Sequence, residues 1–244
     1  MRKPIFKKIV LIFFIFVLSG CASFGQSQKR DRFFQVSTID ALMQGLYEGQ
    51  MTFGQLRSHG DFGIGTFEGL DGEMVALDGK FYQVQYDGKA YPVKESMKTP
   101  FAVVTFFVPD KKASINDPLD DKELQQYLLS LFQTRNLFYA IRIEGEFSYM
   151  KTRSVARQAK PYPSLAEAVK NQSVFEFRDC QGTMVGFYVP GYFKGLNAAG
   201  FHFHFLTQDK KEGGHVLGFK VTKAAVSLSP AQKLCLVLPD SKEF

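Results

Sequence analysis

The sequence predicts an α+β protein rich in β-strands, with mixed, mostly antiparallel sheets in two packed halves and a few short helices. Two observations lead to this class. Asp-Gly pairs at 71–72, 78–79 and 87–88 separate short apolar runs, which is a hairpin pattern. The second half of the chain consists mostly of such runs, whereas residues 120–135 have the apolar spacing of a long helix.

The chain begins with a pattern typical of an exported lipoprotein. A basic leader precedes an apolar run at 9–18, which is shorter than a typical transmembrane helix. The run ends in Leu18-Ser-Gly-Cys21, which resembles a bacterial lipobox. We therefore expect a signal peptide at 1–20, a lipid on Cys21 and a tether at 21–32. Ala22 is compatible with the outer membrane or periplasmic face of a Gram-negative cell; an ordinary signal peptide with an incidental cysteine is the alternative.

This leader explains most of the positive charge. The chain carries +6, and loss of Arg2, Lys3, Lys7 and Lys8 leaves +2. We therefore expect no nucleic-acid partner, and we expect attachment to the membrane through the N-terminal lipid. Cys180 and Cys235 lie in separate strand-like runs, where buried free thiols are more common than a disulfide.

Local patterns predict the remaining elements in order. Capping residues and helical apolar spacing indicate helices at 37–47, 52–58, 120–135 and 164–170. The predicted strands cover 62–67, 73–77, 80–86, 101–108, 138–149, 173–177, 182–188, 201–206, 216–221, 224–228 and 234–238. We expect an N-terminal β-rich half at 33–150 and a C-terminal β-rich half at 151–244 that carries a metal site.

Three of the four histidines fall within one short stretch of the chain. His202 and His204 lie two residues apart in a predicted strand, so they share a face, while the intervening phenylalanines face the other way. His215 opens the next apolar run after a polar loop. A hairpin would bring it beside the other two, whereas His59 lies in a separate loop and is not expected in the site.

Three converging imidazoles suit a divalent metal such as zinc, copper, iron or nickel. Three protein ligands with an open position are typical of a catalytic zinc site. The sequence has no H-E-x-x-H helix, so it does not indicate a zincin protease. Three unrelated histidines on a solvated hairpin are the alternative.

Several motifs together resemble the alpha-acetolactate decarboxylase family, and they occur from about residue 34 to residue 238. They lie at 37–42, 60–66, 70–74, 98–102, 151–155, 160–163, 182–188, 200–205 and 213–217. The resemblance implies conversion of 2-acetolactate to acetoin and carbon dioxide, with Zn²⁺ held by His202, His204 and His215. It further implies catalytic roles for Arg153, Glu73 and Thr66, and a homodimer.

The chain departs from the family pattern at its C-terminus. The resemblance implies a tail with a glutamate that reaches the zinc site, but this sequence stops at Phe244, and Glu243 follows the last strand too soon to be equated with it. Three other interpretations remain open from the residues alone. One is another three-histidine metalloenzyme of cupin type, and the second is a non-catalytic lipoprotein that binds metal or a small hydroxy acid. The third is a structural envelope lipoprotein, which would hold no metal.

Overall fold

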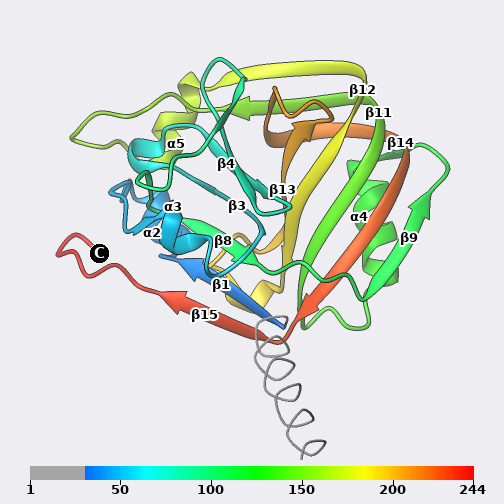
Figure 1. Ribbon diagram of the computed structural model, residues 1–244, viewed down its shortest axis with the longest axis horizontal. Helices are drawn as coiled ribbons and strands as arrows, with labels where there is room; N and C mark the ends of the chain where they lie inside the picture. Colours follow the sequence, from blue (N-terminus) through cyan, green and yellow to red (C-terminus); the bar gives the residue numbers. More distant parts are fainter. Residues whose placement is uncertain (1–30) are drawn as a thin grey trace, which may run out of the picture.

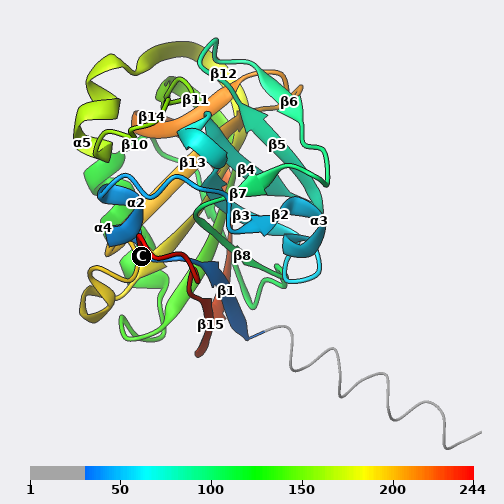
Figure 2. The same cartoon turned by 90° about the vertical axis from the view of Figure 1, so that its left-hand side faces the viewer.

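The computed structural model describes residues 31–244, so the expected signal peptide, Cys21 and most of the tether lie outside the described residues. Two sheets pack face to face, and the helices lie around them (Figures 1 and 2). Within the described part of the chain, no helix is long and apolar enough to cross a membrane. The β-rich, mostly antiparallel class predicted from the sequence is confirmed.

The first sheet has seven strands in the order β15-β1-β8-β3-β4-β5-β6. These are β1 (Arg32–Val36), β3 (Phe62–Thr66), β4 (Glu73–Leu77), β5 (Lys80–Val84), β6 (Ala90–Pro92), β8 (Ala102–Thr105) and β15 (Lys233–Val237). All neighbours are antiparallel except β1 and β15, which run parallel. Asp78 and Gly79 form a two-residue turn between β4 and β5, with positive φ at both positions, as the Asp-Gly signal predicts.

The second sheet contains the longest strands, in the order β10-β14-β11-β12-β13, with β9 also on β14. They are β9 (Lys111–Ile115), β10 (Leu119–Asp120), β11 (Phe138–Ser154), β12 (Ser173–Val189), β13 (Gly200–Thr207) and β14 (Gly213–Ala231). A small separate pair joins β2 (Met51–Thr52) to β7 (Lys98–Thr99). The start of β14 also pairs with β13, so the sheet curls back on itself at that end.

The helices are short, with one exception. They are α2 (Ile39–Met43), α3 (Phe53–Leu56), α4 (Asp121–Leu131) and α5 (Leu165–Ala168), with single 3₁₀ turns η1 (Glu68–Leu70), η2 (Val169–Asn171) and η3 (Gly191–Phe193). A capping box opens α4, because Asp120 and Glu123 each bond the other's main-chain N–H. Leu124 and Leu128 of α4 pack on the second sheet, and Phe53 and Leu56 of α3 pack on the first.

The inner faces of the two sheets share one apolar core. Val75 and Leu77 of β4 contribute from the first sheet, and Val185 and Leu206 contribute from the second. Since alternate residues of a strand share a face, Glu73 of β4 and His204 of β13 also point into this layer. The interface between the sheets therefore positions the candidate site.

The sequence predicts a boundary between two β-rich halves at residue 150. The boundary between the two sheets does not fall there. β11 runs through that position, and β9, β10 and α4 belong with the second sheet. At the other end, β15 returns to the first sheet and pairs with β1 from Arg32 opposite Lys233 onward. The strand at Arg32–Val36 was not predicted, because its partners β8 and β15 are distant in the sequence.

Candidate active site

The β13–β14 hairpin carries the three histidines. His204 lies directly opposite His215 in the register, and His202 precedes His204 on the same face. Phe203 and Phe205 point to the opposite face, where they join the core under α4. Strand alternation and hairpin pairing therefore place three imidazoles together, as the sequence predicted.

The three rings converge closely enough to hold one ion. One nitrogen from each ring lies within 4.8 Å of the others. Nε2 of His202 is 3.1 Å from Nδ1 of His215. Nδ1 of His204 donates to the main-chain oxygen of Met74 at 2.8 Å, and its Nε2 is buried with no hydrogen-bond partner. A carbonyl behind one nitrogen and an unpartnered lone pair on the other are what a metal-bound imidazole requires.

Burial keeps these imidazoles in the neutral form that binds metal. Desolvation, reinforced by the charge of Arg153, lowers the pKa of His202 to about 4. Burial and the neighbouring rings lower the pKa of His204 and His215 well below the ordinary value for histidine. Protons therefore compete only weakly for the three nitrogens at neutral pH.

Glu73 reaches the cluster from the first sheet. One of its carboxylate oxygens lies 3.4 Å from Nε2 of His204, and the residue is 8% exposed. Burial raises the pKa of Glu73 to about 7, although the nearby Arg153 opposes this shift. Since His204 is neutral, this contact is not a pairing of two full charges. Glu73 is instead a carboxyl group that changes protonation near neutral pH.

Arg153 reaches the site from β11, where it lies opposite His215. Its Nη1 donates to Oε1 of Gln172 at 3.2 Å, and its Nε is buried with no partner. The structure therefore brings Arg153, Glu73 and the three histidines together from both sheets. Gln172 was not predicted as a site residue, because nothing in the local sequence pattern distinguishes it from a surface amide.

Thr66 lies beside Glu73 but is already engaged. It is the cross-strand neighbour of Glu73, and its hydroxyl donates to the main-chain oxygen of Gly72 at 2.7 Å. This bond secures the connection that leads into Glu73. The geometry favours a supporting position for Thr66, and its catalytic role stays a prediction.

The other residues considered from the sequence lie elsewhere. His59 stacks on Phe34 at 3.6 Å, and Phe34 belongs to the core on the outer face of the first sheet. Glu243 lines a cavity with Lys160 and Tyr162, and within the described residues the cluster that could hold a metal consists of histidines alone. Cys180 and Cys235 are free thiols, as the sequence favoured.

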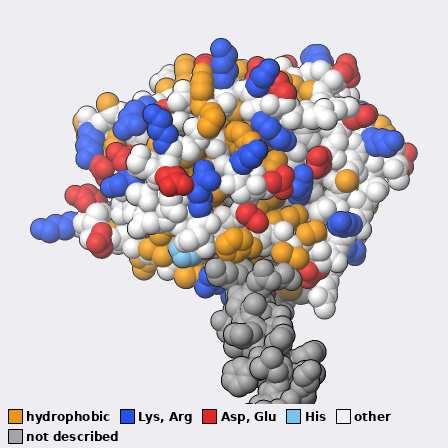
Figure 3. Space-filling model, in the orientation of Figure 1, with side chains coloured by type: hydrophobic (Ala, Val, Ile, Leu, Met, Phe, Trp, Pro, Cys, Tyr) orange, Lys and Arg blue, Asp and Glu red, His pale blue; other side chains and the backbone are white. Residues whose placement is uncertain are grey.

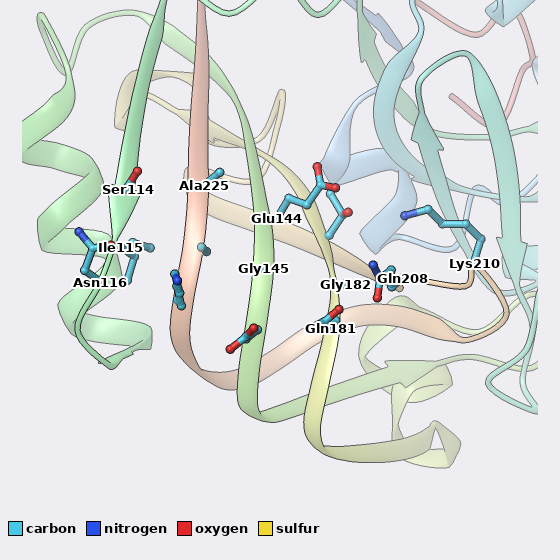
Figure 4. Close-up of a pocket in the computed structure, with 14 residues that line it drawn as sticks. Ser114, Ile115, Asn116, Glu144, Gly145, Gln181, Gly182, Gln208, Lys210 and Ala225 are labelled. Atoms are coloured by element: carbon cyan, nitrogen blue, oxygen red, sulfur yellow. The ribbon is translucent and has the colours of Figure 1, made fainter.

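A separate pocket of about 390 Å³ opens at the far end of the same hairpin (Figure 4). Lys210 extends from the β13–β14 turn toward Glu144 of β11, and Gln181 and Gln208 line the floor nearby. None of the three clustered histidines lines it. On the face shown in Figure 3, acidic and basic side chains are interspersed.

A two-sheet protein with three converging imidazoles, a carboxyl group and an arginine around one point belongs to the class of candidate metalloenzymes. Residues 33–244 match the family model described as "Alpha-acetolactate decarboxylase". The chain belongs to the alpha-acetolactate decarboxylase family.

Individual relatives agree over most of the chain. The protein named alpha-acetolactate decarboxylase from Methanosarcina mazei is 49% identical to this chain, and the match covers 88% of this chain and 74% of the relative. The protein of the same name from Bacillus subtilis is 39% identical, and the match covers 90% of this chain and 86% of the relative. The crystal structure of alpha-acetolactate decarboxylase from Bacillus subtilis strain 168 superposes with a TM-score of 0.86 at 40% identity. That match covers 87% of this chain and 91% of the other.

Proposed function

We propose that this protein decarboxylates 2-acetolactate to acetoin and carbon dioxide with zinc as its metal. The observation that carries the proposal is the converging three-histidine group, in which the buried Nε2 of His204 lacks a partner while Glu73 and Arg153 adjoin the group. Relatives that are 39–49% identical over the aligned residues carry the name of this activity. His202, His204 and His215 would hold the ion, which when bound supplies a Lewis acid for substrate oxygens.

The reaction needs an acceptor for one electron pair. When the bond between the tertiary carbon and the carboxylate breaks, carbon dioxide leaves and the pair moves into the adjacent ketone, which gives an enediolate. One proton delivered to carbon then yields acetoin. The protein must therefore bind an anionic substrate, stabilise negative charge on vicinal oxygens and deliver one proton.

Arg153 and Glu73 fit these tasks. The Arg153 guanidinium provides forked N–H donors and a permanent positive charge for the carboxylate or the enediolate. Glu73 has a pKa near 7 in the metal-free site, so it is able to hydrogen-bond the substrate hydroxyl or hold a proton at neutral pH. Thr66 stabilises the main chain that precedes Glu73 through its hydrogen bond to the carbonyl of Gly72.

We also propose that the protein is a homodimeric lipoprotein. The basic leader, the apolar run at 9–18 and the lipobox-like Leu18-Ser-Gly-Cys21 support export and attachment through Cys21. The reaction then takes place outside the cytoplasm, at a membrane surface. The resemblance to the family supports the homodimer.

One experiment tests reaction and metal together. A form lacking residues 1–21 is assayed for acetoin from racemic 2-acetolactate before chelation, after chelation and after zinc is restored. We expect activity that disappears with the metal and returns with zinc. Absence of acetoin from folded, zinc-loaded protein would overturn the proposal and favour a binding lipoprotein.

A further inference from the structure

We propose that Gln172 is a positioning residue that fixes the Arg153 guanidinium while leaving its positive charge free for an anionic substrate. The inference rests on the proposed function, since it concerns how this same site binds its substrate. Nothing in the local sequence marks Gln172, which lies 19 residues after Arg153.

The main chain around Arg153 is fixed on both sides. The buried hydroxyl of Thr152 donates to the main-chain oxygen of Gly213 at 2.8 Å, in the strand that carries His215. The buried hydroxyl of Ser154 donates to the main-chain oxygen of Val84 at 2.8 Å, which joins β11 to the first sheet. Since Val84 is the cross-strand partner of Glu73, the second bond also sets Arg153 relative to that carboxyl group.

The side chain of Arg153 is long, and fixing its main chain leaves several rotatable bonds free. The hydrogen bond from Nη1 to Oε1 of Gln172 is the contact that restricts them. Gln172 caps the C-terminal end of the helical segment, α5 and η2, that connects β11 to β12. Its main-chain N–H donates to the carbonyl of Val169, so the end of this connecting segment is itself held in place.

A neutral partner distinguishes Arg153 from Arg142 and Arg157, the neighbouring arginines that form ion pairs. Arg142 pairs with Asp78 and Glu144 at 2.9 and 2.6 Å, and Arg157 lies 3.8 Å from both Glu68 and Asp71. Within residues 31–244, Arg153 has no ion pair, and its Nε is buried without a hydrogen-bond acceptor. An amide therefore orients the guanidinium without neutralising it, which a carboxylate at the same position would do.

Two substitutions separate orientation from charge. Gln172→Ala removes the acceptor, so we expect kcat to fall about 10- to 100-fold, in the range of misoriented catalytic groups. Gln172→Glu keeps an acceptor but adds a competing anion, so we expect a KM for 2-acetolactate raised about 10-fold or more and a smaller change in kcat. Asn171→Ala is the matched control, because Asn171 is exposed in the same connecting segment. All variants are full-length protein in detergent, with metal content and thermal unfolding checked.

A second readout does not depend on turnover. In ¹⁵N-arginine-labelled protein, the Nε–H resonance of Arg153 is identified by its loss in Arg153→Lys. We expect Gln172→Ala to broaden or remove this signal, and Gln172→Glu and Asn171→Ala to retain it. The inference is overturned if Gln172→Ala leaves both the signal and kcat/KM within twofold of the parent. If the parent itself makes no acetoin, the proposed function fails, and the resonance still decides whether Gln172 positions Arg153.

Discussion

His204 of β13 donates a 2.8 Å hydrogen bond from Nδ1 to the main-chain oxygen of Met74 in β4, across the interface between the two sheets. Because a carbonyl only accepts, this bond fixes the tautomer of His204 and directs the Nε2 lone pair into the site. Met74 directly follows Glu73, so one stretch of β4 supplies both the group that orients His204 and the carboxyl group beside it.

We expect His204→Ala to lose both the metal and the activity. The substitution removes one of three ligands and leaves the carbonyl of Met74 without its donor. Metal content after dialysis and acetoin formation are the measurements. His59→Ala is the control, because His59 stacks on Phe34 outside the site. Full metal content and turnover in His204→Ala would remove this histidine from the ligand set.

We expect Arg153→Ala to keep the metal and lose at least about 100-fold in kcat/KM, because it removes charge stabilisation without removing a ligand. Metal analysis and steady-state kinetics on the same preparation separate the two effects. Arg178→Ala is the matched control, since Arg178 of β12 lies over the ring of Tyr149 and contacts none of the site residues named above. Activity near that of the parent would exclude a catalytic role for Arg153.

The pKa of Glu73 predicts a pH dependence of stability in chelated protein. Folding raises this pKa from 4.5 to about 7, so the folded state holds the proton more tightly. The resulting stabilisation is present below pH 4.5 and is lost as the pH rises through 7, on the order of 3 kcal/mol. We therefore expect Glu73→Gln to gain stability relative to the parent between pH 5 and pH 8. Parallel profiles of the free energy of unfolding in denaturant titrations would contradict this.

We expect Cys21→Ser to release the protein from membranes. Without the thiol the lipid cannot be attached, and residues 9–18 form a run shorter than a typical membrane span. Cell fractionation and labelling with a radioactive fatty acid are the measurements. Cys180→Ser serves as the control, because Cys180 lies within β12. Fatty-acid label retained in Cys21→Ser would show that the lipid is attached elsewhere.

Patterns that are local in sequence predicted the parts of the fold that depend on local physics. Glu73–Leu77 has the predicted bounds, and the turn at Asp78 and Gly79 follows from two positions that need positive φ. The shared face of His202 and His204 follows from strand alternation alone. The resemblance to the family was needed for Glu73 and Arg153, since single charged residues carry no such periodicity.

Long-range pairing decided what local patterns did not show. The predicted strands at 173–177 and 182–188 are one strand, because Phe147 and Tyr149 of β11 pair with Cys180 and Arg178 across the polar stretch between them. In the same way, 216–221 and 224–228 join in β14. The partners of Gln172 and of Nδ1 of His204 are distant in the sequence, so composition and spacing contain no signal for them.

The parallel pairing of β1 with β15 constrains how the chain is made. Figures 1 and 2 both show these strands side by side, and Arg32 pairs with Lys233 from the opposite end of the chain. β1 therefore lacks one of its two neighbours until nearly the whole protein has been synthesised. Contacts between such distant segments form slowly. The pairing of β1 with β15 must therefore wait until residues 233–237 have been synthesised, and a chain truncated before residue 233 would leave an open sheet edge that invites aggregation.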